Sequence, residues 1–109
     1  MTRSWPDWRD AVEFTRGRPG INTLHESSEL KVVLVALGAG QRLPAHLGPA
    51  ACFHILRGTG AVLVDDEEIA VTPGATVIAP TGARRSVRAD TPLVFLGNLG
   101  DPGSEPDPS

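Results

Sequence analysis

From residue 20 onward, glycine and proline divide this chain into short segments rich in valine, isoleucine, leucine and threonine. Short apolar segments between turn-forming residues are typical of β-strands, and their regular spacing favours a sandwich or a barrel. We predict strands near residues 21–25, 30–37, 41–47, 51–57, 60–65, 68–72, 76–79, 84–89 and 92–98. The chain is therefore predicted to be all-β.

Only the N-terminus carries helix signals. Ser4 is a suitable N-cap, Pro6 fits the first turn and Asp7 follows the cap by three residues, which predicts a short capped helix. At the other end, residues 101–109 contain no apolar anchor beyond proline, and this composition predicts a disordered tail. Residues 1–100 are then expected to form one domain, because a chain of 109 residues has the usual length of a single domain.

Three turns are marked by residue type. The acidic stretch Asp65-Asp66-Glu67-Glu68 predicts a hairpin turn in which Asp66 adopts the left-handed conformation. Pro73-Gly74 and Pro80-Thr81-Gly82 predict two further turns, since proline presets φ and glycine accepts a positive φ.

Composition argues against several classes of function. Ten basic residues stand against 13 acidic ones, and no basic run is longer than Arg84-Arg85, so no nucleic-acid partner is expected. Cys52 is the only cysteine, which excludes an intrachain disulfide. Neither a secretory leader nor a bilayer-spanning apolar stretch is evident. We therefore expect no membrane partner and a cytoplasmic location.

The longest apolar run covers residues 32–37 and is rich in β-branched side chains. Such a run predicts a strand that is buried on both faces. In so small a domain, the second face needs cover from a packed sheet or from another subunit. Pairing of this run across a two-fold axis would also conceal an exposed edge strand.

Two segments resemble the conserved motifs of the cupin superfamily. The first lies at residues 40–60 and reads Gly40-Gln41-Arg42-Leu43-Pro44-Ala45-His46, followed by Phe53-His54-Ile55-Leu56-Arg57-Gly58-Thr59-Gly60. The second lies at residues 74–89, where Gly74, Pro80 and Gly82 have the spacing of the second motif. The resemblance implies a small jelly-roll β-barrel. It also implies a homodimer, because cupins are often dimers.

The resemblance also shows which ligands are missing. Cupin metal sites commonly use three histidines and a glutamate that face into the barrel, a set suited to iron, manganese, nickel or zinc. Only the first of these positions is kept, at His46. The second histidine position is Gly48, the glutamate position is Ala51 and the third histidine position is Arg85. Because arginine has no lone pair to give a metal, we expect no conventional metal site and no cofactor.

A one-residue shift in the connecting loop leaves an alternative open. If Cys52 rather than Ala51 faces inward, period-two alternation brings His54 inward as well. His46, Cys52 and His54 would then form a three-ligand site for a divalent transition metal. The chain would in that case be a divergent metal-dependent cupin enzyme, an oxygenase or an isomerase.

Arg85 is the most informative departure from the family pattern. A permanent cation in the position of a metal favours a buried carboxylate partner or an anionic ligand; the alternative is an arginine that leans out of the barrel mouth into water. We predict that the barrel binds a small organic anion, with Arg85 as charge partner and His46 as a polar contact. His46 is also the one candidate for acid or base catalysis, and whether the protein is an enzyme stays open.

Three further residues are expected around this ligand. Arg42 shares strand parity with His46, and we expect it at the pocket rim. Phe53 and Ile55 are expected to line the apolar wall, as in most small-molecule sites.

Overall fold

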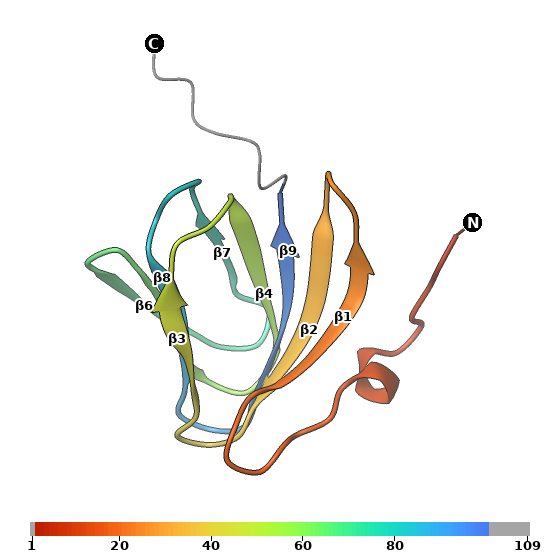
Figure 1. Cartoon of the computed structure of the whole chain (residues 1–109). Coiled ribbons are helices and arrows are strands. Elements are labelled where there is room, and N and C mark those ends of the chain that lie inside the picture. The colour runs from red at the N-terminus through yellow and green to blue at the C-terminus, as the bar shows by residue number, and fades with distance from the viewer. Residues whose placement is uncertain (1, 101–109) are drawn as a thin grey trace.

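The computed structural model describes residues 2–100, which form nine strands in two antiparallel sheets (Figure 1). The strands are β1 (Gly20–Glu26), β2 (Lys31–Leu37), β3 (Arg42–His46), β4 (Ala51–Arg57), β5 (Gly60–Val64), β6 (Glu67–Val71), β7 (Thr76–Ala79), β8 (Arg85–Ala89) and β9 (Leu93–Leu99). One sheet has the order β1-β2-β9-β4-β7 and the other the order β3-β8-β5-β6. All nine predicted strands are present, and the all-β jelly-roll prediction is confirmed.

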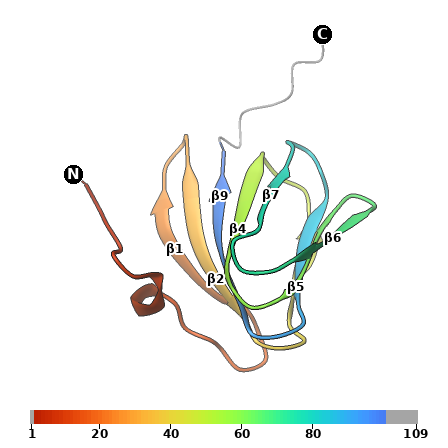
Figure 2. The same ribbon diagram turned by 180° about the vertical axis from the view of Figure 1, so that it is seen from behind.

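The two sheets face each other, and the main core lies between them (Figures 1 and 2). Strand alternation explains which residues enter this core. In β4, Ala51, Phe53 and Ile55 are buried, whereas the residues between them are only half-buried. In β2, Val35 and Leu37 join the same core.

Strand β2 is buried on both faces, as its apolar run predicts. It is hydrogen-bonded to β1 on one side and to β9 on the other, so it is not an edge strand. Its second face, with Leu34 and Ala36, packs against Trp8 and Val12 of the N-terminal segment. The cover of this face is therefore the chain's own N-terminus, and β2 has no free edge that could pair across a two-fold axis.

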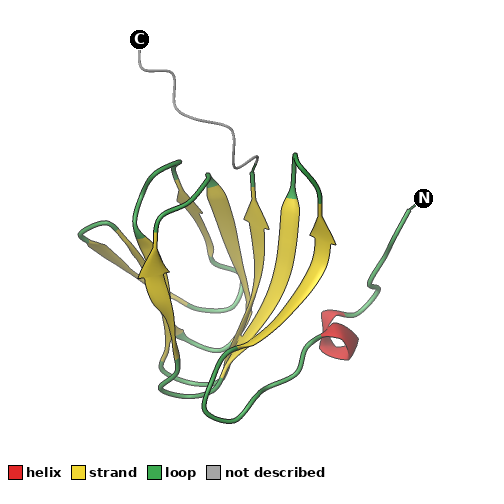
Figure 3. Cartoon of the chain, viewed as in Figure 1, coloured by secondary structure: helices red, strands yellow, loops and turns green. Residues whose placement is uncertain are grey.

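The N-terminal helix is shorter than predicted and begins later. Only a 3-10 turn forms, over Trp8–Ala11 (Figure 3). Its cap is Asp7 rather than Ser4, because the Asp7 carboxylate accepts the backbone N–H of Arg9 at 3.0 Å. This hydrogen bond lowers the pKa of the Asp7 carboxyl below its ordinary value. The turn ends at Val12, which is already extended (φ −118°, ψ 147°).

The turns lie where their residue types predict, with one shift. Gly74 and Gly82 have φ values of 94° and 83°. In the β5–β6 hairpin, however, the positive φ of 52° belongs to Asp65 and not to Asp66. Contacts with a remote residue hold Asp65 in place: its N–H donates to the Arg84 carbonyl at 2.7 Å, and its carboxylate accepts the Arg84 N–H at 2.9 Å.

Two sequence-based expectations concern the outside of the barrel. The predicted disordered tail, residues 101–109, lies outside the described residues. Within residues 2–100, no helix is long and apolar enough to cross a membrane.

Candidate functional site

A cavity of about 200 Å³ lies between the two sheets. Strands β1, β2, β9 and β4 of the larger sheet line one side, and β3 and β8 of the smaller sheet line the other. Its wall is mostly apolar and includes Phe53 and Phe95, whose rings meet edge to face with centroids 5.5 Å apart. Among the described residues of this wall, the ionisable ones are Lys31, His46 and Arg85.

His46 faces the cavity because β3 contains an extra residue. Leu43 pairs with Val87 and His46 pairs with Arg85, so three steps along β3 match two along β8. This is a β-bulge, and it turns both Leu43 and His46 inward despite their odd separation. The Nδ1–H of His46 donates to the Pro44 carbonyl at 3.2 Å, which leaves Nε2 as an acceptor in the neutral ring.

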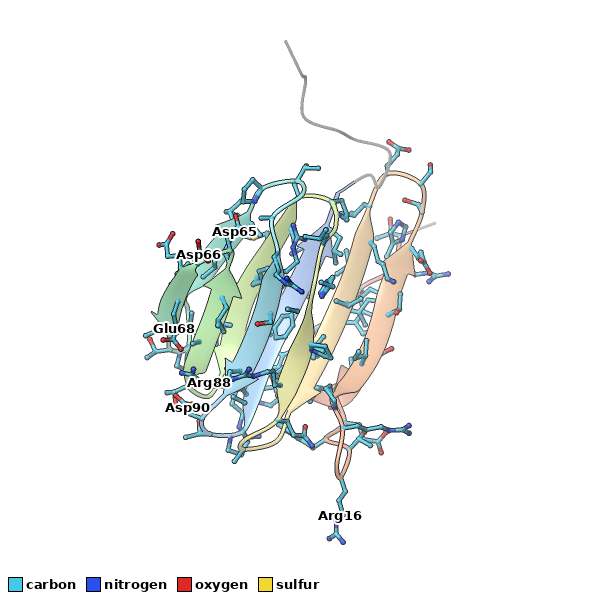
Figure 4. All side chains as sticks on the ribbon, turned by 60° about the vertical axis from the view of Figure 1, so that its left-hand side comes forward. Arg16, Asp65, Asp66, Glu68, Arg88 and Asp90 are labelled. Atoms are coloured by element: carbon cyan, nitrogen blue, oxygen red, sulfur yellow. The ribbon has the colours of Figure 1, made fainter. Side chains whose placement is uncertain are left out.

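The same bulge corrects the expected position of Arg42. Arg42 pairs with Arg88 on the face of β3 opposite to Leu43, and it is exposed and absent from the cavity wall. Arg88 in turn forms ion pairs with Glu68 and Asp90 (Figure 4). Parity with His46 fails as a guide here because it assumed an unbroken alternation along β3.

The expected position of Ile55 is also corrected. Ile55 does face inward, but it is fully buried in the core and does not line the cavity. A small barrel fills most of its interior with side chains. Ile55 lies near the β4–β5 turn and fills this part of the interior. Of the two expected apolar wall residues, Phe53 is the one that lines the cavity.

Arg85 is 1% exposed, and backbone carbonyls surround its guanidinium. Nε donates to Ala83 at 2.8 Å, Nη1 to Pro49 at 2.6 Å, and Nη2 to Pro80 at 3.0 Å and to Gly48 at 3.3 Å. These four bonds use four of the five guanidinium N–H groups and leave one on Nη1. The alternative of an arginine that leans out into water is therefore wrong, because Arg85 is buried and its partners are carbonyl oxygens.

The Arg85 charge stays inside the barrel without a counter-ion. Among the described residues, no carboxylate lies within ion-pair distance of its guanidinium. Burial lowers the pKa of Arg85, and the Asp65 carboxylate in the β5–β6 turn (Figure 4) acts in the opposite direction. Arginine has so high an ordinary pKa that it remains protonated. The cavity wall thus contains a permanent positive charge.

Lys31 is the ionisable wall residue that sequence reasoning missed. It is the first residue of β2 and shares the inward face with Val33 and Val35. Its side chain is 41% exposed, and its ammonium lies 3.6 Å from the Glu26 carboxylate. Alternation along β2 was the available signal, because a lysine two residues before an inward valine also points inward.

The structure also decides between Ala51 and Cys52. Ala51 is buried and lines the cavity, whereas Cys52 and His54 lie on the opposite face of β4. There, Nδ1 of His54 is 2.8 Å from the Thr76 hydroxyl. The alternative site of His46, Cys52 and His54 is not assembled. In residues 2–100, no group of three or more His, Cys, Asp or Glu side chains is placed to hold a metal ion.

Comparison with known proteins settles the family. The cupin domain model matches residues 31–97, more than half of the chain. The chain belongs to the cupin family. Among solved structures, this cupin is 30% identical to an RmlC-like cupin protein from Desulfovibrio desulfuricans. The match covers 94% of this chain and 99% of the Desulfovibrio chain, with a TM-score of 0.83.

Two further solved structures share the fold of this cupin. An uncharacterized conserved protein with a double-stranded beta-helix domain from Klebsiella pneumoniae is 16% identical, with a TM-score of 0.85 and coverage of 96% of this chain and 95% of that one. A predicted oxalate decarboxylase from Thermotoga maritima is also 16% identical, with a TM-score of 0.71 and coverage of 75% and 79%. No curated protein matches this cupin in sequence.

The side chains of this cupin do not fit the metal site common in its family. A Cβ placed on Gly48 would lie 3.5 Å from Nη1 of Arg85, so the guanidinium takes up the space beside that ligand position. Ala51 offers only a methyl group. Within residues 2–100, every buried side-chain nitrogen or oxygen has a hydrogen-bond partner. No orphaned polar atom therefore marks a place for an ion.

Proposed function

We propose that this cupin binds a small organic anion in the cavity between its sheets and that it does so without a bound metal. The observation that carries the proposal is the sign of the charges in the wall. Lys31, His46 and Arg85 are the ionisable residues there, and all three are basic. Among the described residues, the Arg85 charge has no counter-ion and the Lys31 charge has only an exposed one, Glu26. An apolar cavity with such a charge favours a negatively charged ligand, because the charge of each partner compensates the other's desolvation.

The three basic residues contribute in different ways. Arg85 supplies a fixed charge and one remaining N–H on Nη1. Lys31 supplies an ammonium whose present partner, Glu26, is exposed. Because an exposed ion pair contributes little free energy, this ammonium is free to turn toward a ligand. His46 supplies Nε2, which donates a hydrogen bond when the ring is protonated.

The test compares benzoate with benzamide, which has the same ring and no charge. We expect benzoate to raise the thermal unfolding midpoint of the protein by several degrees at saturating concentration, and benzamide to leave it unchanged. Lys31→Met removes one wall cation at similar side-chain length and should weaken the benzoate effect. Arg42→Met removes a cation outside the cavity and is the matched control.

Two results would contradict anion binding. One is equal stabilisation by benzoate and benzamide. The other is an equal loss of the benzoate effect in Lys31→Met and Arg42→Met, which would trace it to net charge rather than to the cavity. Arg85 is not the residue to substitute in this test, because its hydrogen bonds to four carbonyls make any variant also a folding variant.

A further inference from the structure

The three basic residues of the cavity lie at one end of the barrel. Lys31 begins β2 and pairs with Leu99, the last residue of β9. His46 ends β3 and pairs with Arg85, the first residue of β8. In Figure 1 these strand ends all lie at the upper end of the barrel. The basic residues of the cavity are therefore gathered at its mouth, where the exposed Glu26 carboxylate lies 3.6 Å from the Lys31 ammonium.

Below the mouth, the larger sheet presents its inward residues in layers. Val33, Gly97 and Phe53 are register partners on β2, β9 and β4 and form the next layer down. Val35 and Phe95 are partners in the layer below that one. All of these side chains are apolar, so the deeper part of this wall offers no hydrogen-bond donor or acceptor.

Gly97 borders the cavity in the middle layer, together with Val33 and Phe53. A Cβ at this position would lie 3.0 Å from Val33 Cγ2 and 3.3 Å from Phe95 Cε1, so these side chains already crowd the place that a Cβ would take. A methyl group there would push them aside and narrow this part of the cavity. The layer lies directly below that of Lys31 and above that of Phe95.

The size and polarity of the cavity limit its ligand. Its volume of about 200 Å³ exceeds the roughly 150 Å³ that holds benzene in an apolar protein cavity. It falls below the roughly 300 Å³ at which sites for drug-sized ligands begin. A second carboxylate on the ligand would enter the apolar layers without a partner, which is costly.

We infer that the cavity takes an amphiphilic monocarboxylate whose apolar body is one ring or a short aliphatic chain. Its carboxylate lies at the mouth between Lys31, His46 and the remaining Nη1 N–H of Arg85, and its body lies along the apolar wall of Val33, Phe53 and Gly97. This inference rests on the proposed function, which requires only an anion, and it adds the chemical class and the orientation of that anion.

The test measures dissociation constants by calorimetry for acetate, butanoate, hexanoate and succinate. We expect affinity to rise roughly fourfold for each added methylene from acetate to hexanoate, because each methylene becomes buried. Succinate has the four-carbon chain of butanoate with a carboxylate at each end. We expect it to bind at least about tenfold more weakly than butanoate.

A variant tests the orientation. Gly97→Ala narrows the middle layer and should weaken hexanoate binding at least about tenfold while acetate binding changes less than about twofold. Acetate thereby reports whether the variant still folds around an intact mouth. If Gly97→Ala does not fold, Val33→Leu fills the same layer and replaces it.

The possible results separate the two proposals. Three results would overturn the amphiphilic ligand and leave anion binding in place. They are equal affinity for acetate and hexanoate, binding of succinate as tight as that of butanoate, and loss of both acetate and hexanoate binding in a folded Gly97→Ala protein. Absence of binding by every carboxylate, or binding of 1-hexanol as tight as that of hexanoate, would overturn the proposed function itself.

Discussion

Arg85 joins two segments that are far apart in the sequence. It donates to Gly48 and Pro49 between β3 and β4, and to Pro80 and Ala83 between β7 and β8. A planar guanidinium suits this task because its donors point in several directions within one plane. In the position where the family commonly has a metal-binding histidine, this chain has a side chain that binds carbonyls.

Removal of this side chain should destabilise the whole barrel. We expect Arg85→Met to lower the free energy of unfolding by about 3 kcal/mol or more, since buried carbonyls lose charged hydrogen-bond donors. Arg85→Lys should restore only part of this loss, because one ammonium cannot reach all four carbonyls. Urea unfolding followed by circular dichroism measures both effects.

Arg84 provides the control for this prediction. It is exposed and lies next to Arg85, so Arg84→Met should change stability by less than about 0.5 kcal/mol. A loss in Arg85→Met no larger than that in Arg84→Met would show that the carbonyl contacts do not hold the barrel together.

At the scale of elements, glycines shape the turns for two distinct reasons. Gly40 has a φ of 81°, and a Cβ there would meet no atom within 4 Å. Gly58, between β4 and β5, has a φ of 84°, and a Cβ there would lie 2.0 Å from the Pro92 carbonyl oxygen. The first position requires only a left-handed backbone, whereas the second also requires that no side chain be present.

Alanine substitution should separate these two requirements. We expect Gly40→Ala to cost about 1–2 kcal/mol from the left-handed backbone alone, and Gly58→Ala to cost about 3–5 kcal/mol because a clash is added to the strain. Thermal or urea unfolding of the two variants, measured side by side, checks the difference. Equal costs would mean that the chain near Pro92 moves aside easily.

At the scale of the whole molecule, Arg85 connects the β3–β4 and β7–β8 loops at the barrel mouth by hydrogen bonds to their carbonyls. Since Arg85 bridges the two loops, we expect a chelator such as EDTA to leave the thermal unfolding midpoint unchanged within about 1 °C. The measurement is differential scanning calorimetry before and after treatment. A fall of several degrees that added iron, nickel, copper or zinc restores would contradict this account.

The homodimer implied by the family resemblance stays a prediction. Because the N-terminal segment covers β2, a dimer needs another surface. The edge strand β7 is a candidate for this surface, since its Ile78 is 64% exposed. Sedimentation velocity should give a mass of twice 11.5 kDa. The mass of a single chain at every concentration tested would count against the dimer. If a dimer forms, Ile78→Lys tests whether the exposed edge of β7 is its interface.

Most of the fold followed from local sequence signals. Strand positions depend on short apolar runs and on glycine and proline between them, and these act within a few residues. The motif spacing around Gly40, Gly58, Gly74 and Gly82 pointed to the family, and the side chains at its ligand positions could be read directly from the sequence. The sequence also determined that Gly48, Ala51 and Arg85 cannot supply the usual ligands.

Tertiary structure alone decided how the site is arranged. The bulge in β3 exists only in its pairing with β8, and it moved Arg42 away from the cavity while it turned His46 inward. The carbonyl of Pro49 is 36 residues from Arg85 in sequence. No local sequence pattern indicates that the guanidinium would donate a hydrogen bond to it. Strand period is a property of neighbouring residues, whereas bulges and side-chain partners depend on which distant segments meet.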